Sequence, residues 1–193
     1  MANANRIRII GGKWRGRKLA VAPSPGLRPT PDRARETLFN WLAPHIAGAR
    51  VLDLFAGTGA LGFEALSRGA AHATLVDRDG AAVRMLHQHQ QMLEANVVIA
   101  HADAQAFLRQ HRAKAERNAQ DIPRWDLIFL DPPFDSPLLA SVLKDIHPCL
   151  APGGFIYVET DAVFSHPDFA THRASRAGNV HYGLLTQLAA NAP

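Results

Sequence analysis

Short apolar runs alternate with longer amphipathic stretches along the chain from residue 50 onward. The runs RVLDLF, HATLV, NVVIA, WDLIFL and GFIYVE have the length and composition of buried strands, and the stretches between them place apolar residues at helical spacing. Strands that alternate with helices are typical of βαβ units, so we expect an α/β fold with a mostly parallel sheet and helices on both faces. A last pair, HRASRAG and NVHYGLLTQL, predicts an antiparallel hairpin at one edge, which brings the expected sheet to seven strands.

The first residues follow a different pattern. In RIRIIGGKWRGRKLAVAP, basic residues alternate with apolar ones on either side of Gly11 and Gly12. This predicts two short strands joined through the Gly11-Gly12 turn, with one apolar and one basic face. Such a basic face favours a polyanion, above all a nucleic acid, over the alternative of a solvated tail. Residues 1–31 contain no acidic residue and seven basic ones, which are Arg6, Arg8, Lys13, Arg15, Arg17, Lys18 and Arg28.

A proline-rich connector, PSPGLRPTP, separates the basic strands from the rest of the chain. Thr30 is expected to cap the next helix, whose apolar stripe runs from Ala34 to Trp41. We therefore predict a small N-terminal β appendage over residues 1–29 and one main domain over residues 30–193.

Composition narrows the class of protein. The 193 residues suffice for one substantial core, and 47% hydrophobic and 20% charged residues are ordinary for a globular protein. No apolar run reaches the roughly 20 residues that span a membrane, and the N-terminus lacks the apolar centre of a signal peptide. The single cysteine, Cys149, is expected in the core and leaves no disulfide framework, and the histidines show no metal-binding spacing. These features favour the cytoplasm, without a membrane partner or a metal.

The segment VLDLFAGTGALGFEAL places Gly57, Gly59 and Gly62 in the pattern G-x-G-x-x-G between a predicted strand and a predicted helix. Glycines here let the backbone turn sharply and approach a ligand, and the helix N-terminus offers free N–H groups. The next strand ends at Asp77, twenty positions after Gly57, where a carboxylate could accept both hydroxyls of a ribose. The pattern predicts a nucleotide-like cofactor, and a helix cap is the structural alternative for Asp77.

Two further acids bear on which cofactor this is. Asp53 ends the first strand of the main domain, where a carboxylate would attract a cationic group and repel a pyrophosphate. S-adenosylmethionine carries an ammonium and a sulfonium, whereas dinucleotides carry phosphates, so Asp53 favours the former. Asp103 follows the third strand at the same edge and could accept a hydrogen bond from an adenine amino group, with a helix cap as the alternative.

The strand WDLIFL stops abruptly at Asp131, Pro132, Pro133 and Phe134. Proline has no N–H for a sheet ladder, so the chain must leave the sheet here with two φ angles fixed. Ligands bind at the carboxyl edge of such sheets, which places the tetrapeptide beside the cofactor. Asp131 could accept a hydrogen bond from an amine while Phe134 stacks on a planar ring, and a nucleobase fits both. A rigid turn with Phe134 in the core is the alternative.

The combination of VLDLFAGTGALG, LVDRD and FLDPPF resembles class I, Rossmann-like methyltransferases that act on amines and carry the motif [DN]-P-P-[FYW]. More closely, RIIGGKWRGRKL, LRPTPDRARETLFNWL and DLFAGTGALGFEALSRGA are similar to the RsmD family, whose members methylate N2 of a guanine in bacterial 16S ribosomal RNA. The similarity runs from about Arg6 to Glu159. The His- and Gln-rich helix after Asp79 and the segment from Arg117 to Arg124 depart from it.

The resemblance implies a role for each motif. The tetrapeptide from Asp131 to Phe134 would hold the guanine, and the basic strands would hold RNA phosphates. The cofactor would be S-adenosylmethionine, and the partner would be 16S ribosomal RNA in a small-subunit particle or assembly intermediate, bound by a monomer. The residues implied to bind the cofactor are Asp53, Phe55, Ala56, Gly57, Thr58, Gly59, Asp77, Arg78, Asp103 and Ala104.

Three alternatives stay open at this point. An NAD(P)-dependent oxidoreductase would share the glycine pattern but leaves the tetrapeptide and the basic strands unexplained. A non-catalytic RNA-binding protein would not need Asp53, Asp77 and Asp131 together. A DNA adenine-N6 or protein glutamine-N5 methyltransferase would use a similar tetrapeptide, and only the N-terminal segments favour ribosomal RNA.

Overall fold

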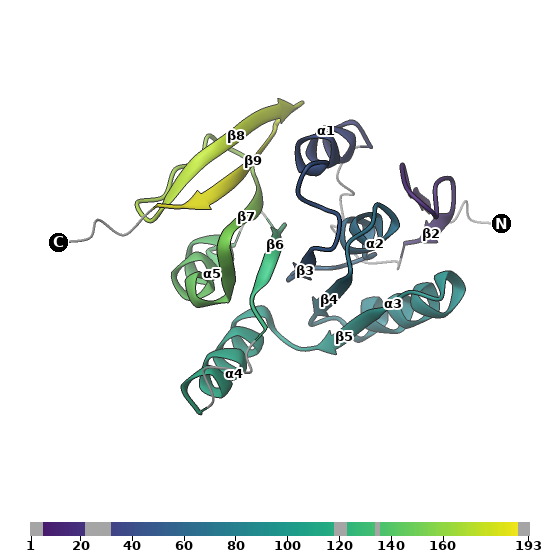
Figure 1. Ribbon diagram of the computed structural model, residues 1–193, viewed down its shortest axis with the longest axis horizontal. Helices are drawn as coiled ribbons and strands as arrows, with labels where there is room; N and C mark the ends of the chain where they lie inside the picture. The colour runs from purple at the N-terminus through teal and green to yellow at the C-terminus, as the bar shows by residue number, and fades with distance from the viewer. Residues whose placement is uncertain (1–5, 22–31, 118–122, 134–135, 189–193) are drawn as a thin grey trace.

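The main element of the computed structural model is a seven-stranded sheet with the strand order β5-β4-β3-β6-β7-β9-β8 (Figure 1). The structure describes residues 6–21, 32–117, 123–133 and 136–188. The five strands from β5 to β7 are parallel, whereas β9 is antiparallel to both of its neighbours. The strands are β3 (Arg50–Asp53), β4 (His72–Asp77), β5 (Val97–His101), β6 (Trp125–Leu130), β7 (Leu150–Thr160), β8 (Phe169–Ala177) and β9 (Val180–Gln187).

Helices cover both faces of this sheet, as the continuous apolar runs predict. Successive strand residues point to opposite faces, so Val51 packs under α1, α2 and α3 while Leu52 packs under α4 and α5. Cys149 is buried on the second face, as expected. The helices are α1 (Asp32–Leu42), α2 (Ala60–Ser67), α3 (Gly80–Leu93), α4 (Ala104–Arg117) and α5 (Leu138–Ile146), followed by the short 3-10 helix η1 (His147–Cys149).

The predicted C-terminal hairpin is confirmed, and its place in the sheet adds a detail that the sequence does not contain. The second strand of the hairpin, β9, inserts between β7 and β8, so the first strand of the hairpin forms the edge. Hydrophobic alternation identifies a strand but not its neighbour, which is why the order was open.

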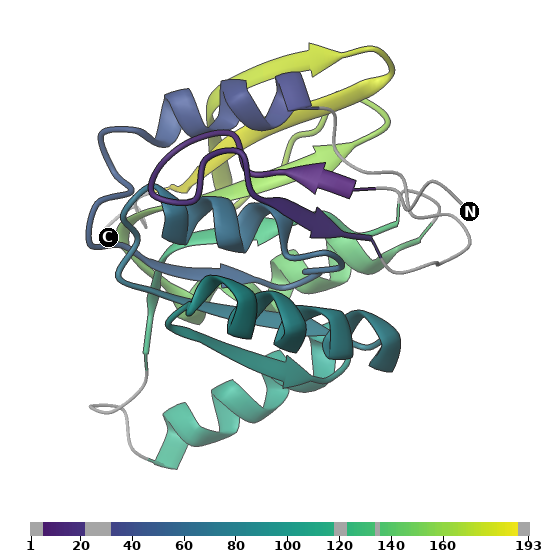
Figure 2. The ribbon, with the colours of Figure 1, turned by 90° about the vertical axis from the view of Figure 1, so that its right-hand side faces the viewer.

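A separate two-stranded sheet forms the N-terminal hairpin, with β1 (Arg6–Arg8) antiparallel to β2 (Lys18–Ala20). Ile7 pairs with Leu19, and both side chains are buried while the basic side chains on these strands are exposed. The prediction of one apolar and one basic face is therefore confirmed. Figure 2 shows the hairpin lying over α2, on the same side of the main sheet as α1 and α3.

The connection between the two hairpin strands is longer than the predicted Gly11-Gly12 turn. It spans residues 9–17, and the Ile9 N–H still donates to the Arg17 carbonyl at 2.9 Å at its base. Gly12 has a φ of +76°, and a Cβ on it would overlap the Ser67 carbonyl. The glycines therefore serve close contact with α2 rather than a tight turn.

The carboxylate of Glu64, on α2, holds this connection. One oxygen accepts from the backbone N–H of Ile10 at 2.7 Å, and the other accepts from Gly11 N–H at 2.8 Å and from Arg68 Nε at 2.7 Å. The Glu64 side chain is fully buried, so its charge is compensated by these donors.

Two other polar side chains reinforce the attachment. Ser67 Oγ accepts from Trp14 N–H at 2.9 Å and donates to the Gly11 carbonyl at 2.6 Å. On the other side of the hairpin, the buried guanidinium of Arg35 donates from Nη2 to the Arg8 carbonyl at 3.0 Å. The hairpin is thus fixed to both α2 and α1.

Some predictions concern residues that the structure does not describe. Thr30 and Arg28 lie outside the described residues, as does the predicted division at residues 29 and 30, and α1 is described from Asp32 onward. Within the described parts of the chain, no helix is long and apolar enough to cross a membrane.

Replacing Glu64 with alanine should release the hairpin from α2. The variant leaves the Ile10 and Gly11 N–H groups and the Arg68 guanidinium without their acceptor, so we expect a loss of about 3 kcal/mol in the free energy of unfolding. Native-state hydrogen exchange should show faster exchange at the two amides, whereas the exposed Glu36→Ala on α1 should leave both rates unchanged. Unaltered protection of both amides in Glu64→Ala would contradict this role.

Candidate functional site at the carboxyl edge of the sheet

The carboxyl ends of β3, β4, β5 and β6 meet at one edge, where the acidic motifs of the sequence lie. The chain runs outward from β3 to β4 and β5 and then crosses back to β6 on the other side of β3. The strand order therefore reverses between β3 and β6, which is the position where open α/β sheets bind ligands. Asp53 ends β3, and Asp131 directly follows β6, so both acids flank this crevice.

The glycine-rich loop between β3 and α2 is held rigidly at this edge. Gly57 donates its N–H to Asp77 Oδ2 at 2.7 Å, and Ala56 donates to the Val76 carbonyl at 3.0 Å. Gly59 has a φ of +76°, and a Cβ on it would overlap the side chains of Phe63 and Leu86. Glycine at position 59 therefore lets the loop pack directly against α2 and α3 in a conformation that a larger residue would not adopt.

The third glycine of the pattern serves helix packing. A Cβ on Gly62 would overlap the side chain of Leu75 in β4, so glycine lets α2 lie directly on the sheet. Asp53 Oδ2 accepts from Gly62 N–H at 3.0 Å and thereby ties the first turn of α2 to the end of β3.

Asp53 is more deeply buried than a ligand-facing carboxylate at a sheet edge is expected to be, with 2% of its surface exposed. Burial raises the pKa of Asp53 to about 7, and the negative charge of Asp77 adds to this shift, although the Gly62 N–H opposes it. Near neutral pH both the protonated and the charged form of Asp53 are therefore populated, and a nearby cation would favour the charged form. The predicted role toward a cationic ligand stays a prediction.

Asp77 and Asp103 both bind backbone N–H groups. Asp77 Oδ1 accepts from Asp79 N–H at 2.8 Å, while its Oδ2 binds the glycine loop. The residue that caps α3 is Asp79, whose side chain accepts from Ala81 N–H. Asp103 Oδ1 accepts from Gln105 at 3.0 Å and from Ala106 at 3.1 Å, so the helix-cap alternative for Asp103 is observed. Hydrogen bonds to a ribose or an adenine remain predictions for these two acids.

The other residues implied to bind the cofactor differ in exposure. Phe55 is half-buried, Ala56, Thr58 and Ala104 are buried, and Arg78 is exposed. The structure places them with the acids at the carboxyl ends of β3, β4 and β5, either in the following loop or, for Ala104, at the first residue of the following helix.

At the end of β6, Asp131 is half-buried, Pro132 is buried and Pro133 is exposed, while Phe134 lies outside the described residues. Leu130 pairs with Val158, which places Asp131 next to Glu159 of β7 at the same edge. Glu159 is buried and accepts the Tyr157 hydroxyl at 2.7 Å. This edge therefore gathers several carboxylates, a set of acceptors for amino groups.

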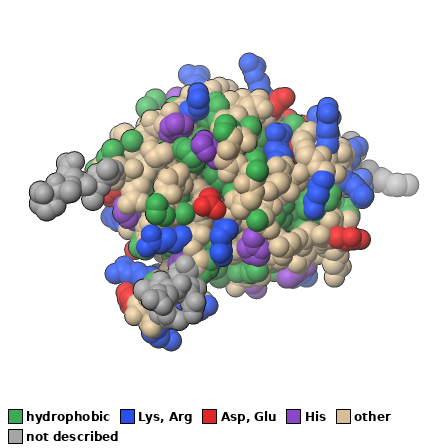
Figure 3. All heavy atoms as spheres, viewed as in Figure 1, with side chains coloured by type: hydrophobic (Ala, Val, Ile, Leu, Met, Phe, Trp, Pro, Cys, Tyr) green, Lys and Arg blue, Asp and Glu red, His purple; other side chains and the backbone are tan. Residues whose placement is uncertain are grey.

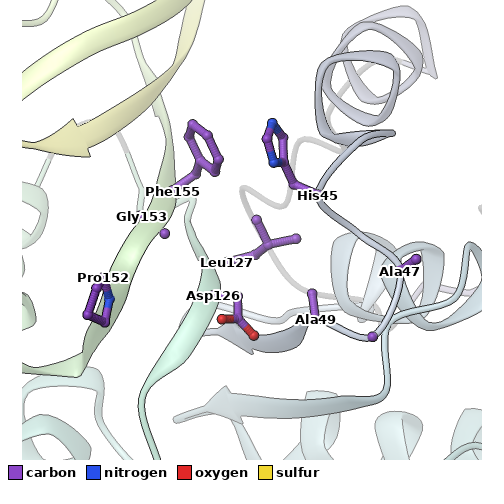
Figure 4. Close-up of a pocket in the computed structure, with 10 residues that line it drawn as sticks. His45, Ala47, Ala49, Asp126, Leu127, Pro152, Gly153 and Phe155 are labelled. Atoms are coloured by element: carbon purple, nitrogen blue, oxygen red, sulfur yellow. The ribbon is translucent and has the colours of Figure 1, made fainter.

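The described residues contain no group of three or more His, Cys, Asp or Glu side chains that could hold a metal ion. A separate pocket of about 330 Å³ lies at the opposite, amino edge of the sheet (Figure 4). His45, Asp126 and Phe155 line it, and Asp126 Oδ2 accepts from the Arg50 N–H at 2.7 Å where β3 begins. Since Asp126 and Asp131 lie at opposite ends of β6, this pocket is distinct from the candidate site.

The exposed basic residues of the hairpin form a cationic surface. In Figure 3, lysine and arginine side chains gather at the end of the molecule that carries the hairpin in Figure 1. Lys13 Nζ lies 4.2 Å from the centre of the Trp14 ring, and Arg8 Nη2 lies 3.7 Å from Asp32 Oδ2. Of the predicted RNA-binding residues, those exposed in the structure are Arg6, Arg8, Lys13, Arg15, Arg17 and Lys18.

The sheet order, the glycine loop and the acids at the carboxyl edge define a class I, Rossmann-like methyltransferase fold. A family model described as "Conserved hypothetical protein 95" matches residues 7–186. An Escherichia coli protein named ribosomal RNA small subunit methyltransferase D is 45% identical over 190 residues, which are 95% of this chain and 91% of the relative. The chain therefore belongs to the RsmD family and is a methyltransferase.

Solved structures agree with this assignment. The putative methyltransferase yhhF from Escherichia coli has 44% identity and a TM-score of 0.81, and the match covers 96% of this chain and all of that one. SMU.776, a putative methyltransferase complexed with SAH, has 17% identity and a TM-score of 0.71 over 96% of this chain and 56% of its own, so it supports the fold alone.

Several residues that organise the site were not identified from the sequence. Glu64 interrupts the apolar run ALGFEALS, and a lone acid at a buried helical position is a signal that could have found it. His89 lies among glutamines and another histidine, and its burial is visible only in the structure. Glu159 ends a strand run without any pattern that separates it from an ordinary polar residue.

The pH dependence of stability should report the protonation of Asp53. Folded Asp53 keeps its proton up to about pH 7, whereas the unfolded group loses it near pH 3.8. The folded state therefore binds more protons in this window, so the Asp53 contribution to the unfolding free energy is complete below pH 3.8 and is lost as pH rises through about 7. The loss amounts to roughly 4 kcal/mol.

Asp53→Asn keeps an acceptor for Gly62 N–H but cannot ionise. Urea unfolding at a series of pH values should show the stability of this variant rising relative to the original protein between about pH 4 and pH 8. Parallel stability curves for the two proteins would contradict the assignment.

Proposed function

We propose that this methyltransferase transfers a methyl group from S-adenosylmethionine to the exocyclic N2 of a particular guanine in the 16S RNA of the small ribosomal subunit. The observation that carries the proposal is the position of Asp131 and its two prolines beside the strand-order reversal, opposite the rigid glycine loop. The name of the Escherichia coli relative supports small-subunit ribosomal RNA as the substrate.

The residues of the site fit S-adenosylmethionine. Gly57 and Gly59 both have a positive φ, which lets the loop turn with its backbone exposed to a ligand, and Asp53 supplies a carboxylate whose charged form a cationic group would favour. The shared fold with a protein complexed with SAH is consistent with this cofactor. When bound, S-adenosylmethionine supplies a methyl group on a positively charged sulfur.

The protein's own residues would orient the nucleophile. The guanine N2 is a weak nucleophile because its lone pair is delocalised into the ring. Asp131 and the carbonyl of Pro132 would accept hydrogen bonds from the two N2 hydrogens. These bonds would direct the lone pair of N2 out of the ring plane, toward the methyl carbon. Charge-assisted bonds of this kind are about twice as strong as neutral ones, but correct placement of the reactants can contribute more, about 7–11 kcal/mol.

The basic hairpin would hold the RNA backbone independently of sequence. The target base would leave its stack at a cost of a few kcal/mol, and Phe134 would offset part of that cost by stacking on it. A small-subunit particle or assembly intermediate as the substrate, and a monomeric enzyme, are part of this proposal.

Mapping of N2-methylguanine in small-subunit RNA tests the proposed reaction. RNA from cells without the gene should lack one modification, which the original gene should restore and Asp131→Ala should not. The control is Asp126→Asn, a change at the opposite end of the same strand, which should restore the modification.

Purified Asp131→Ala should still bind S-adenosylmethionine within a few fold of the original affinity, as titration calorimetry would show. Restored methylation by this variant would refute the role of Asp131. An unchanged set of N2-methylguanines in cells without the gene would refute the substrate, and loss of a methyladenine in DNA or a methylglutamine in protein would point to the related chemistries.

Replacing Arg6, Arg8, Arg15 and Arg17 together with glutamine should weaken RNA binding. For each phosphate that the variant no longer binds, the salt dependence of affinity should flatten by about 0.7–0.9 log units per log unit of salt, because fewer counterions are released. Filter binding at several salt concentrations would measure this.

The matched control removes the same charge from α4, on the other face of the sheet. Its four substitutions to glutamine, at Arg109, Arg112, Lys114 and Arg117, should leave the salt slope unchanged. Equal effects of the two sets would mean that total charge, not the hairpin, governs RNA affinity.

A further inference from the structure

His89, on α3, connects the hairpin to the glycine-rich loop. Its Nε2 lies 3.0 Å from the backbone N of Ala20, the last residue of β2. Its Nδ1 lies 3.3 Å from the carbonyl of Thr58, which stands between the first two glycines of the loop. One imidazole ring thus contacts both the predicted RNA-binding element and the predicted cofactor-binding element.

These two contacts fix the protonation state of the ring. The Ala20 N–H can only donate, so Nε2 must accept, and the proton must therefore sit on Nδ1 and be donated to the Thr58 carbonyl. Burial lowers the pKa of His89, although the bond to Thr58 opposes the shift, so the neutral ring is favoured. Only 3% of the residue's surface is exposed, and water cannot easily replace either partner.

The surroundings of His89 leave it little freedom. The ring packs edge-to-face with Phe63 on α2, with centroids 6.0 Å apart and an interplanar angle of 82°. Asp79 caps the first turn of α3, which fixes the helix that carries the histidine. A displacement of β2 would therefore be transmitted to the Thr58 carbonyl instead of being absorbed by a change of rotamer.

We propose that His89 is a positioning residue that couples the basic hairpin to the glycine-rich loop, so that RNA and S-adenosylmethionine bind this enzyme cooperatively. The inference rests on the proposed function, because it assigns RNA to the hairpin and the cofactor to the loop. RNA that binds the observed hairpin position more tightly than a displaced one also favours the bond from Ala20 N–H to His89, and this bond in turn favours the loop shape that receives the cofactor. The reciprocal effect of the cofactor on RNA affinity must have the same size.

Equilibrium dialysis can measure this coupling directly. The labelled ligand is S-adenosylhomocysteine, which cannot transfer a methyl group, and the RNA probe is small ribosomal subunits from cells that lack the gene. The affinity for S-adenosylhomocysteine should rise about fivefold or more when saturating subunits are present, a size typical of coupling between two sites.

Two variants interrupt the link from different sides. His89→Phe occupies a similar space without either hydrogen bond. Ala20→Pro removes the donating N–H, which points away from β1 and therefore belongs to no strand pairing. Each should reduce the effect of subunits on S-adenosylhomocysteine affinity to less than about twofold, and the double variant should lose no more than either single one. His87→Phe, an exposed position two residues away on α3, should keep the full effect.

The conservative variant His89→Gln separates positioning from general packing. A glutamine can accept from Ala20 and donate to Thr58, so it should restore most of the coupling that His89→Phe loses. If His89 acted through packing alone, His89→Phe should instead retain more of the coupling than His89→Gln. Coupling that survives in His89→Phe, or that is lost equally in both His89 variants with their folds intact, would overturn the inference.

The outcomes keep this inference apart from the proposed function. If the original protein binds both ligands but without mutual enhancement, the coupling is wrong and the proposed reaction stands. If it binds neither S-adenosylhomocysteine nor the subunits, the proposed function itself fails. Circular dichroism and urea unfolding of each variant establish that a loss of coupling is not a loss of fold.

Discussion

Helix α2 is buried on both sides, and the arrangement of the whole site depends on this constraint. Seven of its residues, from Leu61 to Ser67, are buried, although a helix at the surface of an α/β sheet commonly exposes one face. Gly62 brings the inner side into contact with Leu75 of the sheet, and Glu64 and Ser67 on the outer side bind the hairpin. A helix held in this way cannot shift without disturbing either the sheet or the hairpin.

The same helix begins at the glycine-rich loop, so its fixed position determines the shape of that loop. Asp53 holds the first turn of α2 against the end of β3, and Asp77 holds Gly57 against the end of β4. The hairpin, by packing on the outer side, excludes water from Glu64 and strengthens its hydrogen bonds. Ile9, Trp14 and Leu19 belong to the same hydrophobic cluster as residues of the main sheet. The N-terminal segment therefore contributes to the core of the main domain in addition to forming a basic surface.

Much of this could be predicted from the sequence, for identifiable reasons. The parallel sheet and its edge follow from local periodicity. Asp53, Asp77 and Asp131 could be placed at strand ends because glycine or proline follows each of them within a few residues. The partners of Glu64 and His89 in the hairpin could not be predicted, because they lie 53 to 69 positions away along the chain. Such contacts depend on where the hairpin packs on the main domain. The alternation of apolar and basic residues predicts the two strands but not their position on the main domain.

The distribution of ionisable groups suggests how the site treats charge. Asp53, Asp77, Asp131 and Glu159 gather at one edge of the sheet, and like charges so placed would repel one another. Burial resolves part of this conflict by keeping Asp53 protonated up to about pH 7, so that the ligand-free site carries less negative charge than its residues imply. A cationic ligand would favour the charged form of Asp53 and so release its proton, whereas these carboxylates would repel a pyrophosphate. The exposed cations of the hairpin and the carboxylates at this edge lie on different elements, so the protein can present positive charge to a polyanion on one surface and negative charge to a cation on another.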